Sequence, residues 1–199
     1  MAEDIGITAE PAQNPAVCKL TVDRPIYPDG SAWFNNLEKT KEAPLAEALL
    51  SIEGMAEVLI SHDTLTLTKN SEEPWQVLAR TAAMTVRDHI RSEKPAVSDA
   101  YKESLPPATE IMVKMQTLLD QKLNPSIASH GGMIELLDVK GNNIFIRMGG
   151  GCQGCGMADV TLKQGIETLV RQEIPEVGGI FDTTDHAAGR NPYYTPSTK

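Results

Sequence analysis

The amino-acid sequence predicts an α+β protein of two small domains, each a short antiparallel sheet packed against helices, joined by a proline-rich polar linker. In each half of the chain, paired runs of strand-forming residues adjoin segments of helical periodicity, and these predict the two domains. Between the halves lies a polar stretch, 93–108, which contains three prolines and has little to bury. This stretch predicts the linker.

Composition limits the classes of function. With 199 residues the chain has room for one domain or two small ones, and 41% hydrophobic with 23% charged residues is ordinary globular usage. A net charge of -9 argues against a nucleic-acid partner held through phosphate contacts. No apolar run approaches about 18 residues, so we expect no membrane span. The opening Met1-Ala2-Glu3-Asp4 lacks the basic start of a presequence.

The first domain is expected over 14–92, after a flexible tail at 1–13. In chain order we expect a strand over 16–22, a helix from Pro44 that ends at Gly54, a hairpin of 58–60 and 64–68, and a helix over 75–91. Prolines and a glycine between 25 and 30 predict a break. The helix is expected to cover one face of the hairpin.

The second domain is expected over 109–188, before a tail at 189–199. It starts with a helix over 109–123, which Asn124-Pro125 interrupts. With Asn124 as the cap and Pro125 at the first helical position, a short helical turn follows and ends at Gly131-Gly132. A hairpin of 134–139 and 144–148, a helix over 157–173 and a last strand over 177–181 follow.

A glycine-rich stretch, 149–156, lies between the second hairpin and the last helix and carries two cysteines. Five of its eight residues are glycine, and the cysteines are Cys152 and Cys155. Because glycine has no side chain, another backbone or an inorganic cluster can approach the sulfur atoms closely. The predicted helix begins just after Cys155, and the positive end of a helix dipole favours the thiolate that binds metals.

The number of ligands limits what this pair can hold. Structural zinc and the common iron–sulfur clusters take four protein donors, and the pair supplies half of them. The third cysteine, Cys18, falls in the middle of a predicted strand of the other domain, where a free cysteine is typically buried. A symmetric dimer with its two glycine-rich loops face to face would present four thiolates to one cluster.

Other chemistries remain open for these residues. A cysteine pair of this spacing is also typical of thiol–disulfide redox proteins, and it can bind zinc in an adaptor protein. His130 is either a ligand or the cap of a turn, and Asp185 with His186 is either a metal or acid–base pair or a surface pair. No phosphate-binding loop and no acid–base dyad is evident, so we expect a protein that is not an enzyme.

The motifs that surround the cysteines resemble a known family. Residues 124–132 read Asn-Pro-x-x-Ala-x-His-Gly-Gly, and Gly151-Cys152-x-x-Cys155 and Thr161-Leu162-Lys163-x-Gly165-x-Glu167 follow them. Over about 109–186 this order resembles the C-terminal domain of the Nfu/NifU-like iron–sulfur carrier proteins. Residues 14 to about 100, with Pro44-Leu45-Ala46, the Ile52-Glu53-Gly54 turn and a Thr-Leu-Thr hairpin, resemble the N-terminal Nfu domain.

The resemblance implies a function for the pair. In that family a 4Fe-4S cluster, labile and shared by two subunits, is carried by the cysteine pair, here Cys152 and Cys155, and passed to apo-proteins. It implies a homodimer when loaded, with upstream cluster-assembly proteins and apo iron–sulfur client proteins as partners. The lack of a mitochondrial presequence points to a bacterial cytoplasm. The roles of Cys18, His130 and His186 are left open.

Overall fold

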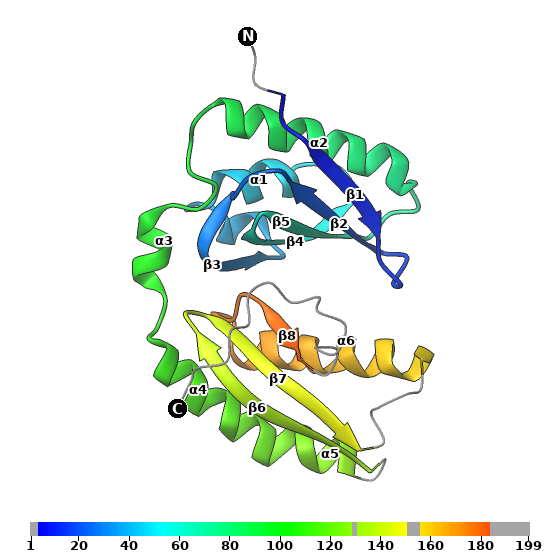
Figure 1. Ribbon diagram of the computed structural model, residues 1–199, viewed down its shortest axis with the longest axis vertical. Coiled ribbons are helices and arrows are strands. Elements are labelled where there is room, and N and C mark those ends of the chain that lie inside the picture. Colours follow the sequence, from blue (N-terminus) through cyan, green and yellow to red (C-terminus); the bar gives the residue numbers. More distant parts are fainter. Residues whose placement is uncertain (1–3, 129–130, 151–155, 184–199) are drawn as a thin grey trace. The chain divides into compact units, whose positions relative to one another are not determined.

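The computed structural model describes residues 4–128, 131–150 and 156–183 (Figure 1). The chain forms two compact units, an N-terminal unit of residues 1–106 and a C-terminal unit of residues 107–199. Each unit holds one sheet packed with helices, which confirms the α+β class. None of the helices in the described part of the chain is both long and apolar enough to cross a membrane.

The sheet of the N-terminal unit has five antiparallel strands in the order β1-β2-β5-β4-β3. The strands are β1 (Ile7–Pro11), β2 (Val17–Val22), β3 (Tyr27–Phe34), β4 (Met55–His62) and β5 (Thr64–Lys69). The predicted strand and hairpin are therefore confirmed as β2 and as β4 with β5. The prolines and the glycine at 25–30 predicted a break, yet β3 starts among them as an edge strand with an irregular register between Tyr27 and Ser31.

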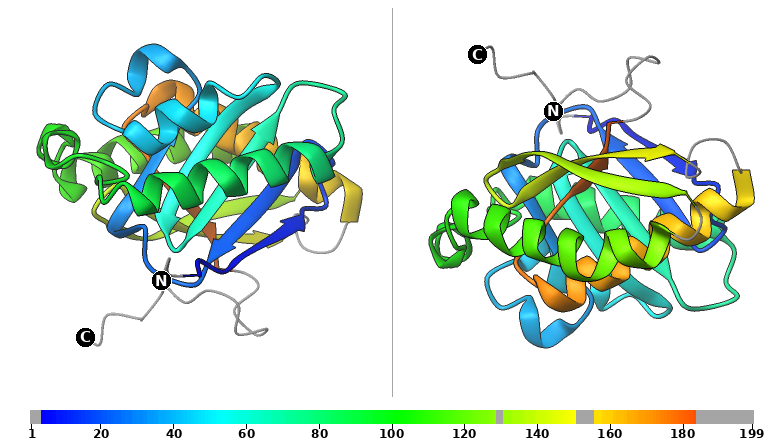
Figure 2. Two further views of the ribbon diagram at one scale, coloured as in Figure 1. Left: turned by 90° about the horizontal axis from the view of Figure 1, so that it is seen from above. Right: turned by 90° about the horizontal axis from the view of Figure 1, so that it is seen from below.

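The N-terminal unit also holds a 3₁₀ turn η1 (Leu37–Lys39) and the helices α1 (Pro44–Leu50), α2 (Trp75–Arg91) and α3 (Asp99–Ser104). Of these, α1 and α2 pack against one face of the sheet. The range of α2 is as predicted, and α2 lies across the sheet in the left view of Figure 2. Alternate residues of the strands, among them Leu20, Leu67 and Ile60, are fully buried against α1 and α2.

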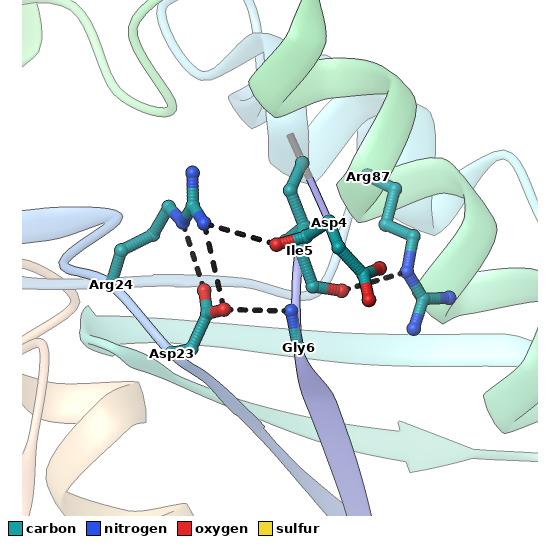
Figure 3. Close-up of polar contacts among 6 residues, drawn as sticks. All are labelled: Asp4, Ile5, Gly6, Asp23, Arg24 and Arg87. Atoms are coloured by element: carbon teal, nitrogen blue, oxygen red, sulfur yellow. Dashed lines mark hydrogen bonds and ion pairs between the residues drawn. The ribbon is translucent and has the colours of Figure 1, made fainter. Parts of the chain in front are cut away.

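The flexible tail expected at 1–13 is wrong for its second half, because β1 pairs with β2 along its whole length. The side chains of β1 are largely exposed, so it lacks the apolar alternation by which a strand is recognised. Two contacts just before β1 hold it instead. Ile5 is buried in the core at 2% exposure, and the Arg87 side chain on α2 donates from Nε to the Ile5 carbonyl oxygen at 3.0 Å (Figure 3).

A carboxylate and a guanidinium fasten the same segment from the end of β2 (Figure 3). Asp23 accepts the Gly6 amide at 2.8 Å and the Nε of Arg24 at 2.8 Å, while Arg24 Nη2 donates to the Asp4 carbonyl oxygen at 3.3 Å. The hydrogen bond from Arg24, with that from the Gly6 amide, lowers the pKa of the Asp23 carboxyl below its usual value.

Asp23 is therefore expected to stabilise the N-terminal unit in a pH-dependent way. Because its pKa is lower in the folded than in the unfolded state, its contribution is complete above the unfolded pKa and is lost as the pH falls below about 4. Asp23→Asn should lower the urea midpoint of the N-terminal unit near neutral pH, with a difference from wild type that shrinks in acid. Glu72→Gln, which removes an exposed carboxylate, should leave the midpoint unchanged. An equal difference at all pH values for Asp23→Asn would contradict this account.

The linker expected at 93–108 is also corrected, because most of it belongs to the N-terminal unit. Ala96 and Val97 are buried at 4% and 3% exposure. Ser98 then caps α3, and its amide donates to the Glu42 carbonyl oxygen at 2.8 Å. Tyr101 packs its ring 5.5 Å from that of Phe34. The stretch is polar on average, and its few apolar residues did not stand out in that average. For this reason the sequence predicted a linker.

The C-terminal unit holds a three-stranded sheet of order β6-β7-β8 with its helices on one face. Its elements are α4 (Ala108–Leu118), a π-helical turn η2 (Leu119–Leu123), α5 (Asn124–Ala128), β6 (Gly132–Lys140), β7 (Asn143–Gly150), α6 (Gly156–Glu173) and β8 (Ile180–Asp182). The right view of Figure 2 shows α4 and α5 along the β6–β7 hairpin. Ile111 and Met115 of α4 and Ile166 of α6 meet the buried side of the sheet in one core.

The sequence predicts a purely antiparallel second sheet, and this prediction is wrong for its last strand. Strands β6 and β7 form the expected antiparallel hairpin, but β8 pairs parallel to β7, from Ile144–Ile180 to Ile146–Asp182. The reason is the connection: α6 carries the chain back along the sheet, so the strand that follows runs in the same direction as β7.

Candidate functional site

The C-terminal unit presents the ends of two elements on either side of the cysteine pair. Strand β7 ends at Gly150 and helix α6 begins at Gly156. Residues 151–155 join them and include Cys152 and Cys155, which lie outside the described residues. What the structure defines at this site is therefore its frame, by which we mean the ends of β6 and β7 and the start of α6 that flank residues 151–155.

On the strand side, the frame is the open end of the β6–β7 hairpin. Gly132 pairs with Gly150, Met133 with Gly149, and Ile134 with Met148. Gly131 precedes this ladder in a left-handed conformation, with φ of +68°, and its amide donates to the Ala128 carbonyl oxygen at 2.9 Å. A residue with a side chain would be strained there. The pairs Gly132–Gly150 and Met133–Gly149 thus end the β6–β7 ladder directly before the cysteines in sequence.

On the helix side, α6 is fixed to the sheet by its buried face. Ile166 and Val170 are 3% and 0% exposed and belong to the same core as Met148, which is 2% exposed. Met148 is thus a core residue of the C-terminal unit. Because Cys155 directly precedes α6 in sequence, the free amides and dipole of the first helical turn favour a thiolate at this point of the chain.

Asn124 contributes a contact that the sequence did not predict. It was expected to cap a new helix after an interruption, but the chain stays helical through α4, η2 and α5. The wider π turn makes this possible. In it the backbone amide of Asn124 donates to the Leu119 carbonyl oxygen, and Pro125, which has no N–H, leaves no unsatisfied donor at the next position. The Asn124 side chain is thereby directed at β6. Its Oδ1 accepts the Ile134 amide at 2.8 Å, and its Nδ2 donates to the Ile134 carbonyl oxygen at 3.0 Å.

The other residues singled out in the sequence are Cys18, His130, Asp185 and His186. Cys18 is 1% exposed in the core of the N-terminal unit, as its strand position predicted, and burial raises the pKa of its thiol. His130, Asp185 and His186 lie outside the described residues. Across residues 4–128, 131–150 and 156–183 no group of three or more His, Cys, Asp or Glu side chains is placed to hold a metal ion.

Two family models match the chain, one in each unit. The N-terminal match, described as "Scaffold protein Nfu/NifU N terminal", covers residues 7–93 and so begins at β1. The C-terminal match, described as "NifU-like domain", covers residues 115–181 and includes η2, the β6–β7 hairpin, the cysteine pair and α6.

Curated proteins with similar sequences carry related names. A NifU-like mitochondrial protein of Arabidopsis thaliana, number 5 of its series, is 28% identical over 94% of this chain and 72% of that protein. The Fe/S biogenesis protein NfuA of Pseudomonas aeruginosa is 48% identical, with 44% of each chain aligned. The chain thus matches less than half the length of this bacterial relative.

A solved structure of a NifU-like protein from Saccharomyces cerevisiae matches 48% of this chain and 86% of its own, at 16% identity and a TM-score of 0.44. The two family matches and the sequence relatives together identify the chain as a member of the Nfu/NifU-like proteins, with an Nfu N-terminal domain followed by a NifU-like domain.

Proposed function

We propose that this protein binds a 4Fe-4S cluster between two copies of the chain, through Cys152 and Cys155 of each copy, and delivers the cluster to apo-proteins. The cluster is cargo in this proposal, so the chain acts as a scaffold and carrier without catalysing a reaction. The name of the Pseudomonas relative, an Fe/S biogenesis protein, supports a role in supplying such clusters.

One observation carries the proposal. Both cysteines fall in the short connection between the end of β7 and the start of α6, inside the region that matches the NifU-like domain. The only other cysteine of the chain, Cys18, is buried in the core of the other unit and is not presented as a ligand. Two thiols per chain are half of what a 4Fe-4S cluster requires, so a second chain supplies the rest.

Two donors from each chain also suit a carrier. A cluster held by only two bonds per subunit at an open hairpin end is easier to release than one enclosed by four ligands from a single chain. We assign recognition of clients or of upstream assembly proteins to the N-terminal domain, which ends after α3. We assign the protein to a bacterial cytoplasm; relatives from bacteria support a bacterial source, while mitochondrial proteins of Arabidopsis thaliana also match.

Anaerobic reconstitution of the full chain with iron and sulfide tests the proposal. The expected product contains about four irons and four sulfides per two chains, has the visible absorbance of an iron–sulfur cluster, and sediments as a dimer. Zinc retained at one per chain without that absorbance would favour a zinc-bridged adaptor instead. A reversible disulfide between Cys152 and Cys155, with no iron uptake, would favour the redox alternative.

A further inference from the structure

The outer edge of β6 is closed by a side chain at the end that adjoins the cysteine pair. Ile134 turns both its amide and its carbonyl away from β7 and towards Asn124, which bonds to each. The pair Ile134–Met148 is therefore of the non-hydrogen-bonded type, in which such groups point outwards. The carboxamide of Asn124 takes the place that the backbone of another strand would occupy.

The bonds from Asn124 lie next to the end of the hairpin that is least stable by itself. The ladder beyond Ile134 consists of Met133–Gly149 and Gly132–Gly150, with Gly131 before it. Glycines in a strand weaken it, because they have more conformational freedom to lose and no side chains to pack. Met133, the one large side chain there, is 57% exposed and adds little packing.

Asn124 itself is firmly held. Leu123 and Ile127 on either side of it are 3% and 4% exposed in the core of the C-terminal unit, and Leu119 at the start of η2 is fully buried. The helical segment is thus anchored without the Asn124 carboxamide. Removing that group releases the end of β6 while the helix stays packed.

We propose that Asn124 is a positioning residue for the cysteine pair: its two bonds to Ile134 fix the end of the β6–β7 hairpin and hence the point, Gly150, from which the connection to α6 departs. This inference rests on the proposed function of the pair as a cluster ligand. Asn124 acts through the backbone of β6 and β7, which its bonds to Ile134 hold in place.

Asn124→Ala in the full chain tests the proposal, first without a cluster. Hydrogen exchange should become at least about 10-fold faster at the amides of Ile134 and Gly149, while that of the α4 core amides is unchanged. The rate of alkylation of Cys152 and Cys155 is measured peptide by peptide as a function of pH. The rise of this rate should occur at a higher pH than in wild type, because a looser connection favours the thiolate form less at the helix start. In the loaded protein, loss of iron to a chelator should be about 10- to 100-fold faster, the range for residues that orient metal ligands.

Asn142→Ala is the matched control. Asn142 lies at the turn between β6 and β7, at the far end of the same hairpin, is 2% exposed, and donates from Nδ2 to the Glu176 carbonyl oxygen at 3.1 Å. The substitution Asn142→Ala removes a hydrogen bond between a carboxamide and the backbone, as Asn124→Ala does, but at the end of the hairpin that is remote from Gly150. It should leave the alkylation profile and the rate of iron loss as in wild type.

The outcomes separate the two proposals. If Asn124→Ala and Asn142→Ala change alkylation and iron loss equally, Asn124 has a general structural role and the inference is overturned. Unchanged exchange at Ile134 and Gly149 in Asn124→Ala would also overturn it. If wild-type protein takes up no cluster, the proposed function fails, whereas the exchange and alkylation results still report whether Asn124 positions the hairpin end.

Discussion

Replacement of either Cys152 or Cys155 by serine is expected to abolish cluster binding and the cluster-dependent dimer together. A serine hydroxyl does not replace the soft thiolate that iron–sulfur clusters require, and each chain supplies only two donors. Losing one donor per chain leaves two for the whole cluster in a dimer. Iron and sulfide content after anaerobic reconstitution, with sedimentation equilibrium on the same samples, measures both effects.

Cys18→Ala is the control for that experiment. The Cys18 thiol is buried in the core of the N-terminal unit at 1% exposure, so its removal should leave iron content and the loaded dimer as in wild type. Loss of iron in Cys18→Ala would mean that the ligand count is wrong. A loaded dimer in Cys152→Ser would likewise contradict the assignment of the pair as ligands.

Phe34→Ala is expected to destabilise the N-terminal unit by about 3–5 kcal/mol, the range for removing a large aromatic side chain from a core. Phe34 is 1% exposed on β3 and packs its ring 5.5 Å from that of Tyr101. Because the C-terminal unit has its own core, it should remain folded and take up the cluster normally. Calorimetry of the full chain, with iron content measured below the new transition, tests this separation.

Leu37→Ala gives the matched surface control, since Leu37 is 50% exposed in the same unit and its loss should change stability by no more than about 0.5 kcal/mol. If Phe34→Ala unfolded both units in one transition and lost the cluster, the units would not be independent. Delivery to a client apo-protein should fail in Phe34→Ala above the new transition if the N-terminal domain recognises clients. Unchanged delivery under those conditions would remove that role.

The elements that the sequence predicts well are those whose signal is local. The helix α2 and the hairpins β4–β5 and β6–β7 show their periodicity over adjacent residues, and all three are confirmed. Strand β1 and the buried residues Ala96 and Val97 were missed. Their order comes from contacts with residues far away in the sequence, which a window of composition does not reveal.

The candidate site divides in the same way. The spacing of Cys152 and Cys155 among glycines is a local signal that predicts a ligand pair, and this stays a prediction because both cysteines lie outside the described residues. The contact of Asn124 with Ile134 depends on a π turn and on where the helix lies against the edge of β6. A preference of asparagine for helix caps predicted the wrong local role, because the bonds it makes in the fold are to another element. The parallel pairing of β8 likewise depends on how α6 crosses the sheet.

The central claim is that two chains share one 4Fe-4S cluster through their cysteine pairs, and Mössbauer spectroscopy of the anaerobically purified, iron-labelled full chain tests it most directly. The expected spectrum is that of a single 4Fe-4S species, with about four irons per two chains in the same sample. A spectrum of isolated iron sites, or a 4Fe-4S spectrum from a sample that sediments as a monomer, would contradict a cluster bridged by Cys152 and Cys155 of two chains.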